Sequence, residues 1–320
     1  MIKKLTCVLI ALLMITAVFS ACGDNTPDTE KINIVCTLFP YYDWVRSIVG
    51  ENENINITLL LDSGTDLHSY QPTATDIITI SSADLFIYTG GASDSWVKDV
   101  LKTSKNESTV VLELITNLTE EELYCVEAIG EEEHHHEEGE EHHHTHDEHI
   151  WLSLRNAMKL SEIIKNILQD IDEANKDTYQ SNFIKFRSAL EELDNSYKNT
   201  FADCSKNTLV FADRFPFIYL TKDYSLNYHA AFSGCSAESE ASFETVTRLA
   251  QEIDKLELSY IVITETADGS VANTVKNATK DKNQEILTLN ALQSVTVDKL
   301  SLSYLTVMEE NLAVLKKALS

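Results

Sequence analysis

Short apolar runs alternate with amphipathic stretches along most of the chain. Eight of these runs predict β-strands, because a parallel strand that is covered on both faces reads as a near-continuous apolar segment. The runs form two groups of four, at 32–38, 55–61, 84–88 and 109–114, and at 208–212, 226–232, 260–264 and 285–289. Helical patterns separate most of them. The sequence therefore predicts an α/β fold with two lobes, each built on a mostly parallel four-stranded sheet.

A long helical pattern lies between the two groups of predicted strands, from about residue 153 to residue 201. In its second half, aromatic and leucine side chains recur at steps of three and four, at Tyr179, Phe183, Phe186, Leu190, Leu193, Tyr197 and Phe201. This spacing predicts one packing stripe on a helix about 35 Å long. No Gly or Pro occurs between Gly139 and Pro216. We therefore expect a stiff connection between the lobes and only small lobe movements.

The first 22 residues are typical of a bacterial export signal. Lys3 and Lys4 precede an apolar stretch at 5–19 that is too short to cross a bilayer comfortably. The segment Phe19-Ser20-Ala21-Cys22 then resembles a lipobox, in which the Cys is lipidated and becomes the mature N-terminus. The alternative is a cleaved secretory signal in which Cys22 has no role. With residues 23–31 as a polar tether, we expect a protein anchored through Cys22 to the outer face of the cell membrane.

Composition narrows the classes of function. The chain has 320 residues, with 25 Lys and Arg against 51 Asp and Glu, and a net charge of −26. This balance argues against a nucleic-acid binder, which needs a basic face to neutralise phosphates. The length suits one large domain or two of about 150 residues, and the two groups of strands favour two. We divide the chain into an N-terminal lobe at 32–172, a connecting helix at 173–203 and a C-terminal lobe at 204–320.

The cysteine pattern argues against a cysteine-based zinc finger or a thioredoxin-like site. Six cysteines occur, none of them in a CxxC pair, and four remain after the export signal. Export permits disulfides, and Cys204 with Cys235 is a possible pair. Cys36 lies within an apolar run and is expected to be a buried thiol.

One segment has an unusual composition. Residues 131–149 read EEEHHHEEGEEHHHTHDEH and hold eight of the ten His in the chain. Because no apolar residue interrupts the segment, it cannot build a core and we expect a mobile loop. Imidazole and carboxylate suit Zn²⁺ and its neighbours in the transition series, so the loop is predicted to collect metal, with a solvated acidic loop as the alternative. The collecting residues would be His134, His135, His136, His142, His143, His144 and His146.

Candidate metal ligands follow the predicted strands. His68 comes after the strand at 55–61, and His149 comes after the fourth strand and the His-rich loop. In the second half of the chain, Asp213, Glu265 and Asn290 each follow a strand directly. Open α/β sheets bind ligands beyond the carboxyl ends of their strands, so these side chains are expected at the functional edges of the two sheets.

Two motifs carry a family resemblance. The segments DLHSYQP at 66–72 and DEHIWLS at 147–153, with a His-rich acidic loop between them, resemble the zinc-type solute-binding proteins of bacterial ABC transporters. The segments LFPYYDW at 38–44 and ADLFIYTGG at 83–91 match as well. The resemblance implies two α/β lobes bridged by one rigid helix, with a metal in the cleft between them. It also implies a monomer without catalytic activity that delivers the metal to an ABC-transporter permease and its ATPase.

The resemblance also implies a set of ligands. His68 and His149 match the first two, and the third, which is His in many zinc carriers and Glu in manganese carriers, falls on Asp213. The fourth position aligns with Asn290, but a neutral amide oxygen is a weak zinc ligand and Glu265 is chemically better. The fourth position therefore stays open.

Three further residues have possible roles near the metal. His229, on the strand at 226–232, is another candidate for the open position. Asp66 and Asp147 are candidates to orient the histidine rings, because metal-bound imidazoles usually donate their second N–H to an acceptor.

Zinc is favoured over manganese, because the loop is rich in imidazole and nitrogen donors favour metals late in the Irving–Williams series.

One alternative function is a secreted zinc-dependent hydrolase with Glu265 as the general base, although the sequence has no HExxH motif. A surface adhesin or an extracellular zinc buffer is another. In the favoured interpretation, the loop gathers metal weakly and the strand-end ligands then bind it tightly.

Overall fold

A computed structural model describes residues 31–103, 106, 108–125, 146–234, 240–296 and 301–320. The predicted export signal with Cys22, most of the His-rich loop and Cys235 lie outside these residues. Among the described helices, none is both long enough and apolar enough to cross a membrane.

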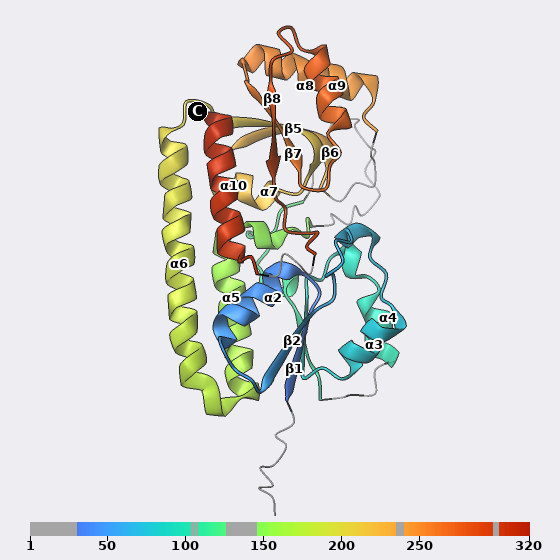
Figure 1. The fold of residues 1–320 in the computed structure, drawn as a ribbon, viewed down its shortest axis with the longest axis vertical. Coiled ribbons are helices and arrows are strands. Elements are labelled where there is room, and N and C mark those ends of the chain that lie inside the picture. The colour runs from blue at the N-terminus through green and yellow to red at the C-terminus, as the bar shows by residue number, and fades with distance from the viewer. Residues whose placement is uncertain (1–30, 104–105, 107, 126–145, 235–239, 297–300) are drawn as a thin grey trace, which may run out of the picture.

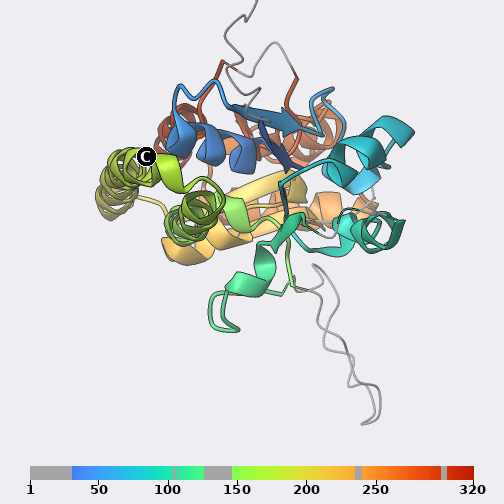
Figure 2. The same cartoon turned by 90° about the horizontal axis from the view of Figure 1, so that it is seen from below.

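The N-terminal lobe is built on a four-stranded parallel sheet with the order β2-β1-β3-β4. Its strands are β1 (Ile32–Cys36), β2 (Ile55–Leu59), β3 (Leu85–Tyr88) and β4 (Val110–Glu113). Its helices are α2 (Phe39–Val49), α3 (Ala74–Ser81), α4 (Val97–Thr103) and α5 (Leu154–Ile171). Helices α2 and α5 lie on one side of the sheet, and α3 and α4 lie on the other (Figures 1 and 2). This double cover explains why the strands are apolar runs and why β3 is buried along its whole length.

The C-terminal lobe repeats this architecture with the strand order β6-β5-β7-β8, again all parallel. Its strands are β5 (Thr208–Phe215), β6 (Asn227–Ser233), β7 (Tyr260–Thr264) and β8 (Glu285–Leu289). Its helices are α7 (Ile218–Asp223), α8 (Phe243–Leu256), α9 (Ser270–Ala278) and α10 (Tyr304–Leu319). Along β5, Val210 and Ala212 belong to a small core that includes residues of α8 and α9, whereas Leu209 and Phe211 join the main core shared by both lobes. The predicted two-lobed α/β fold is confirmed.

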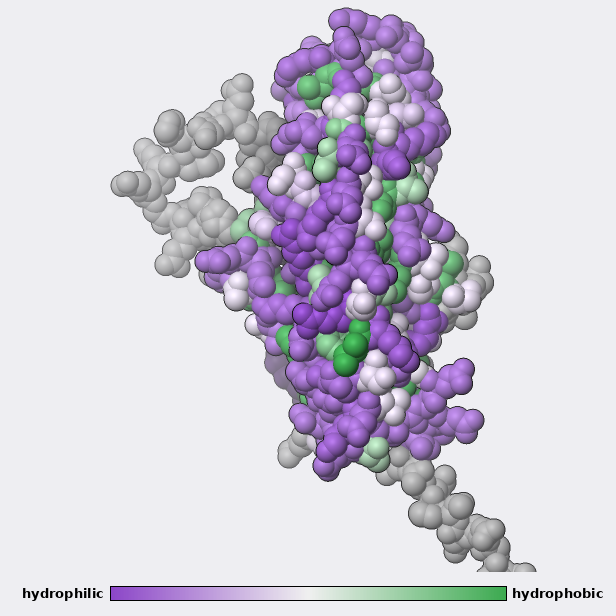
Figure 3. All heavy atoms as spheres, turned by 90° about the vertical axis from the view of Figure 1, so that its left-hand side faces the viewer, coloured by the Kyte–Doolittle hydropathy of each residue, from purple (hydrophilic) through white to green (hydrophobic). Residues whose placement is uncertain are grey.

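Helix α6 (Lys176–Asp203, 28 residues) connects the lobes and runs along the side of both of them (Figure 1). It contacts α5 and α2 of the N-terminal lobe and α10 of the C-terminal lobe. The predicted stripe is its packing face, since six of the seven side chains are buried and Phe201 is partly buried. The Tyr197 hydroxyl also donates a hydrogen bond to the Met308 carbonyl at 2.6 Å. Figure 3 views this side of the molecule and shows a mostly hydrophilic surface, as expected for the outer face of an amphipathic helix.

The loops at the carboxyl ends of the two sheets meet between the lobes. The indole N–H of Trp151, in the N-terminal lobe, donates to the Ala291 carbonyl of the C-terminal lobe at 2.8 Å. The Tyr304 hydroxyl donates to the Trp151 carbonyl at 2.6 Å, and the Tyr219 hydroxyl donates to the Asp147 carbonyl at 2.7 Å. These contacts bring the residues that follow the strands of each lobe to a common boundary.

The described cysteines agree in part with expectation. Cys36 is fully buried, and burial raises the pKa of its thiol well above the ordinary value. Among the described residues Cys204 forms no disulfide, and its possible partner, Cys235, lies outside them.

The buried stripe of α6 gives a direct test of the connecting helix. Leu190 is fully buried, whereas Ile184 on the same helix is 57% exposed. We expect Leu190→Ala to lower the free energy of unfolding by about 3 kcal/mol, because it leaves a cavity in the main core. The matched change Ile184→Ala should cost less than about 0.5 kcal/mol. Urea denaturation followed by circular dichroism measures both, and equal effects would contradict this packing.

Candidate metal site between the lobes

His68 lies in a short 3₁₀ turn, Leu67–Ser69, that Asp66 caps. The Asp66 Oδ1 atom accepts a hydrogen bond from the backbone N–H of His68 at 2.9 Å. On the ring, Nδ1 lies 2.8 Å from Ser93 Oγ and 3.1 Å from Glu148 Oε1. The other ring nitrogen, Nε2, is buried and has no hydrogen-bond partner. A buried nitrogen without a partner is costly, which makes Nε2 an atom prepared for a ligand.

Glu148 is the carboxylate that holds the His68 ring. It accepts hydrogen bonds from the backbone N–H of Ser93 at 3.1 Å and from the Ser93 hydroxyl. Burial raises the pKa of Glu148. Hydrogen bonds from His68 and Ser93 and the charges of His149 and His68 outweigh burial and lower the pKa to about 2. Because an ionised carboxylate can only accept, the proton of the His68 ring belongs on Nδ1 and the lone pair on Nε2.

Gly91 makes room for this carboxylate. A Cβ atom at position 91 would lie only 2.1 Å from Glu148 Oε2, closer than any real contact. The glycine is therefore required by close approach, since Glu148 must reach both Ser93 and His68.

His149 is fully buried and follows the His-rich loop directly. Its Nδ1 atom lies 2.9 Å from Asp147 Oδ1, which also accepts from the His149 backbone N–H at 2.9 Å. Its Nε2 atom lies 3.1 Å from Oε1 of Gln293, a residue of the C-terminal lobe. Burial lowers the pKa of His149, but the charge and hydrogen bond of Asp147, the charge of Glu148 and the Gln293 contact outweigh it, so the pKa is raised overall.

The structure brings the two histidines together. Their ring centroids are 5.3 Å apart, with an angle of 62° between the planes. Two imidazoles that bind one tetrahedral zinc ion at about 2.1 Å would have ring centres about 5 Å apart. Among the described residues, however, no three His, Cys, Asp or Glu side chains stand close enough to hold a metal ion. Within the described part of the chain, a third ligand for a metal held by these two imidazoles would have to move toward them.

Asp213 and Glu265 differ in the hydrogen bonds that their carboxylate oxygens accept. Asp213 Oδ2 accepts hydrogen bonds from both the backbone N–H and the hydroxyl of Thr264, which ties the end of β5 to β7. Glu265 Oε2 accepts from the backbone N–H of Ala291 at 2.7 Å, but Oε1 is buried without a partner. Burial raises the pKa of Glu265 and the negative charge of Asp213 adds to the rise, while backbone N–H groups oppose it.

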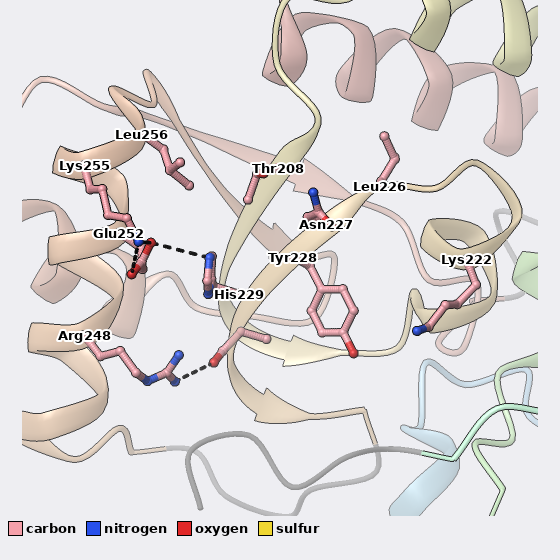
Figure 4. A pocket seen from close by; sticks show the side chains of 11 residues that line it. Thr208, Lys222, Leu226, Asn227, Tyr228, His229, Arg248, Glu252, Lys255 and Leu256 are labelled. Carbon is pink, nitrogen blue, oxygen red and sulfur yellow. Dashed lines mark hydrogen bonds and ion pairs between the residues drawn. The ribbon is translucent and has the colours of Figure 1, made fainter. Parts of the chain in front are cut away.

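The other two candidates have different surroundings. Asn290 uses its side-chain oxygen to accept from the Leu292 backbone N–H at 2.8 Å, so it stabilises its own loop. His229 lines a separate cavity of about 580 Å³ beside α8, where its Nε2 atom lies 3.7 Å from Glu252 Oε2 (Figure 4). Burial lowers the pKa of His229, and the nearby Arg248 and Lys255 lower it further, against the charge of Glu252.

Most of the predicted metal-collecting loop lies outside the described residues, including His134, His135, His136, His142, His143 and His144. His146 is described. Its Nδ1 atom lies 3.6 Å from Cys125 Sγ, and its Nε2 atom lies 3.5 Å from Glu120 Oε2.

Sequence reasoning missed three residues of this site. Glu148 holds the ring of His68, whereas Asp66, the residue expected to do so, caps the backbone. The other two, Ser93 and Gln293, come from distant segments and carry no metal-binding signal. Of the three residues, only Glu148 could have been found from the sequence, because it stands next to His149 in the DEHIWLS motif.

The chain matches the model of one protein family and is similar in sequence to known zinc-binding proteins. The family described as "ZnuA: Zinc-uptake complex component A periplasmic" matches residues 34–318 of the chain. The chain is 31% identical over 317 residues to the zinc-binding lipoprotein AdcA of Streptococcus pneumoniae, covering 98% of this chain and 61% of AdcA. It thus spans about three fifths of the length of these AdcA relatives. It is 30% identical over 322 residues to the high-affinity zinc uptake system protein ZnuA of Bacillus subtilis, covering 96% of this chain and 97% of that protein.

Solved structures share the two-lobed fold. The Zn(II)-bound ZnuA-like domain of Streptococcus pneumoniae AdcA has a TM-score of 0.71 at 28% identity, covering 90% of this chain and 99% of that domain. The metal-dependent lipoprotein YcdH of Bacillus subtilis has a TM-score of 0.72 at 25% identity, covering 91% of this chain and all of the YcdH chain.

Proposed function

We propose, from the premise that this chain belongs to the ZnuA family of zinc-uptake components, that it captures Zn²⁺ outside the cytoplasm and delivers it to an ABC-transporter permease. The observation that carries the proposal is the close pair of imidazoles between the lobes, from the fully buried His149 and the largely buried His68, with ring centroids 5.3 Å apart. Each ring has a carboxylate at Nδ1, from Glu148 and Asp147 respectively. This arrangement raises the basicity of a metal-binding nitrogen and fixes its direction, as in many zinc proteins.

Glu265 is the best-supported third ligand. Its Oε1 atom is buried and unpaired, whereas the Oδ2 atom of Asp213 already accepts two hydrogen bonds from Thr264, which hold that carboxylate against β7. Zn²⁺ with two neutral imidazoles and one carboxylate leaves a net charge near +1, which a partly buried cleft tolerates. Nitrogen-rich ligand sets favour zinc over manganese.

The remaining parts of the chain serve capture and delivery in this proposal. The His-rich loop gathers metal ions at low affinity and raises their concentration near the cleft. A lipid on Cys22 holds the protein at the outer face of the cell membrane, close to the permease, and the AdcA relative is named as a lipoprotein. The permease and its ATPase are the expected partners of a monomeric carrier.

The two imidazoles give the first test. We expect His68→Ala and His149→Ala each to weaken Zn²⁺ binding by about a hundredfold or more, because each removes a ligand that is already in position. His229→Ala is the matched control, since His229 lies in a separate cavity, and it should leave affinity unchanged. Competition with a chromogenic chelator measures all three. Zinc binding at wild-type strength in either site variant would rule out this pair as the metal site.

The third ligand can be identified by a pair of conservative changes. We expect Glu265→Gln to weaken Zn²⁺ binding by at least about tenfold, because an amide oxygen is a poor zinc ligand. Asp213→Asn should keep the affinity while lowering the melting temperature, since it weakens the hydrogen bonds to Thr264. Calorimetric titration and thermal melts separate the two effects. The reverse pattern would make Asp213 the ligand.

Deletion of residues 131–144 tests the division between collection and tight binding. We expect the shortened protein to bind one Zn²⁺ with unchanged affinity in calorimetry, because the strand-end ligands remain. Uptake by cells that depend on this protein should fall only when zinc is scarce. A shortened protein that folds normally and yet loses the tight site would show that the loop supplies an essential ligand.

A further inference from the structure

The loop that carries His68 belongs to the N-terminal lobe but is held by the C-terminal lobe. The backbone N–H of Gly64 donates to the Val295 carbonyl at 3.1 Å, and the Ser294 hydroxyl donates to the Gly64 carbonyl at 2.7 Å. Ser63 and Thr296 form an isolated antiparallel bridge next to these contacts. The position of the His68 loop therefore depends on the opposite lobe.

Arg214 adds a contact to Asp66, two residues before the histidine. Its Nη2 atom donates to Asp66 Oδ2 at 2.9 Å, and both side chains are only about one fifth exposed, at 21% and 22%. The second oxygen of the same carboxylate, Oδ1, accepts from the backbone N–H of His68. One carboxylate thus joins the guanidinium of the C-terminal lobe to the turn that aims the His68 ring.

The local structure of β5 sends Arg214 across the boundary. The register of β5 against β6 shifts between Phe211 and Arg214, which marks a bulge, and a bulge redirects the side chains that follow it. Asp213, just before Arg214, is tied sideways to Thr264 of β7. Asp213 therefore makes its contact within the sheet, whereas Arg214 makes its contact between the lobes.

The chemistry of arginine makes this a positioning contact. A guanidinium stays protonated in proteins and has no lone pair to offer, so Arg214 cannot bind the metal. Its contact also differs from that of Gln293, which sits on Nε2 of His149, the atom that zinc would take. Arg214 leaves both Nε2 atoms untouched, so its contact with Asp66 can persist when the metal binds.

We propose that Arg214 is a positioning residue for metal capture, which holds Asp66 from the opposite lobe and thereby keeps His68 aimed at His149. This inference rests on the proposed function. It makes zinc affinity depend on a contact between the lobes that includes no ligand.

The test uses the full protein with Zn²⁺ as the probe. Arg214→Met removes the charge and keeps the length of the side chain, and Arg214→Lys keeps the charge. Arg155→Met is the matched control, since Arg155 also reaches a residue of the C-terminal lobe, with Nη2 3.0 Å from the Asp223 carbonyl. Chelator competition gives zinc affinity, and hydrogen exchange of the metal-free protein reports on the backbone N–H of His68.

We expect Arg214→Met to weaken zinc binding by about tenfold, as is usual when a residue that orients a ligand is removed. Exchange at the His68 N–H should be faster, Arg214→Lys should restore part of the affinity, and Arg155→Met should change neither measurement. Asp66→Asn should also weaken binding, and combining it with Arg214→Met should add little, because both changes break one contact.

Unchanged or tighter zinc binding in Arg214→Met would overturn the inference, and tighter binding would show that the guanidinium opposes the metal by its charge. An equal loss in Arg155→Met would also overturn it, because the effect would then be general destabilisation. Failure of the proposed function has a different signature, in which the wild-type protein binds no zinc or His68→Ala binds zinc as well as the wild type does.

Discussion

The candidate site depends on one interaction that occurs twice, a buried carboxylate held against Nδ1 of an imidazole. Glu148 does this for His68, and Asp147 does it for His149. A histidine can present either ring nitrogen, and it is the partner of one nitrogen that decides which lone pair is available. With Nδ1 engaged in both rings, Nε2 of His68 has no hydrogen-bond partner, while Nε2 of His149 contacts Gln293, which a metal would have to displace.

Placing these carboxylates in the interior destabilises the protein unless other groups hydrogen-bond to them. Carboxylates in a dry environment are disfavoured unless they are hydrogen-bonded, and Glu148 remains ionised because Ser93 and His68 donate to it. Gly91 provides the space for that approach. Three buried polar atoms near the boundary, His68 Nε2, Asp147 Oδ2 and Glu265 Oε1, have no partner. Such unpaired atoms destabilise the protein and are best explained by a ligand that uses them.

The packing between the lobes makes the site a property of the whole molecule. Helix α6 buries its stripe against both lobes, and the strand-end loops exchange hydrogen bonds across the boundary. Close-packed interfaces of this kind resist large rearrangement. The stiff connection stays a prediction, while contacts such as Arg214–Asp66 join the loop of a candidate ligand to the other lobe.

The sequence by itself determined the parallel strands and the connecting helix, and its motifs singled out the two histidines as candidate ligands. Each of these depends on neighbours within a few residues, such as the apolar period of α6 or the motif around His149. Tertiary structure decided everything that depends on which loops meet. Ser93 and Glu148 are 55 positions apart, and His149 and Gln293 are 144 apart, so no local pattern connects them. Tertiary structure also decided that Arg214, and not Asp213, contacts the N-terminal lobe. A bulge in β5 changes the direction of the side chains that follow it, and the periodicity of the sequence does not reveal a bulge.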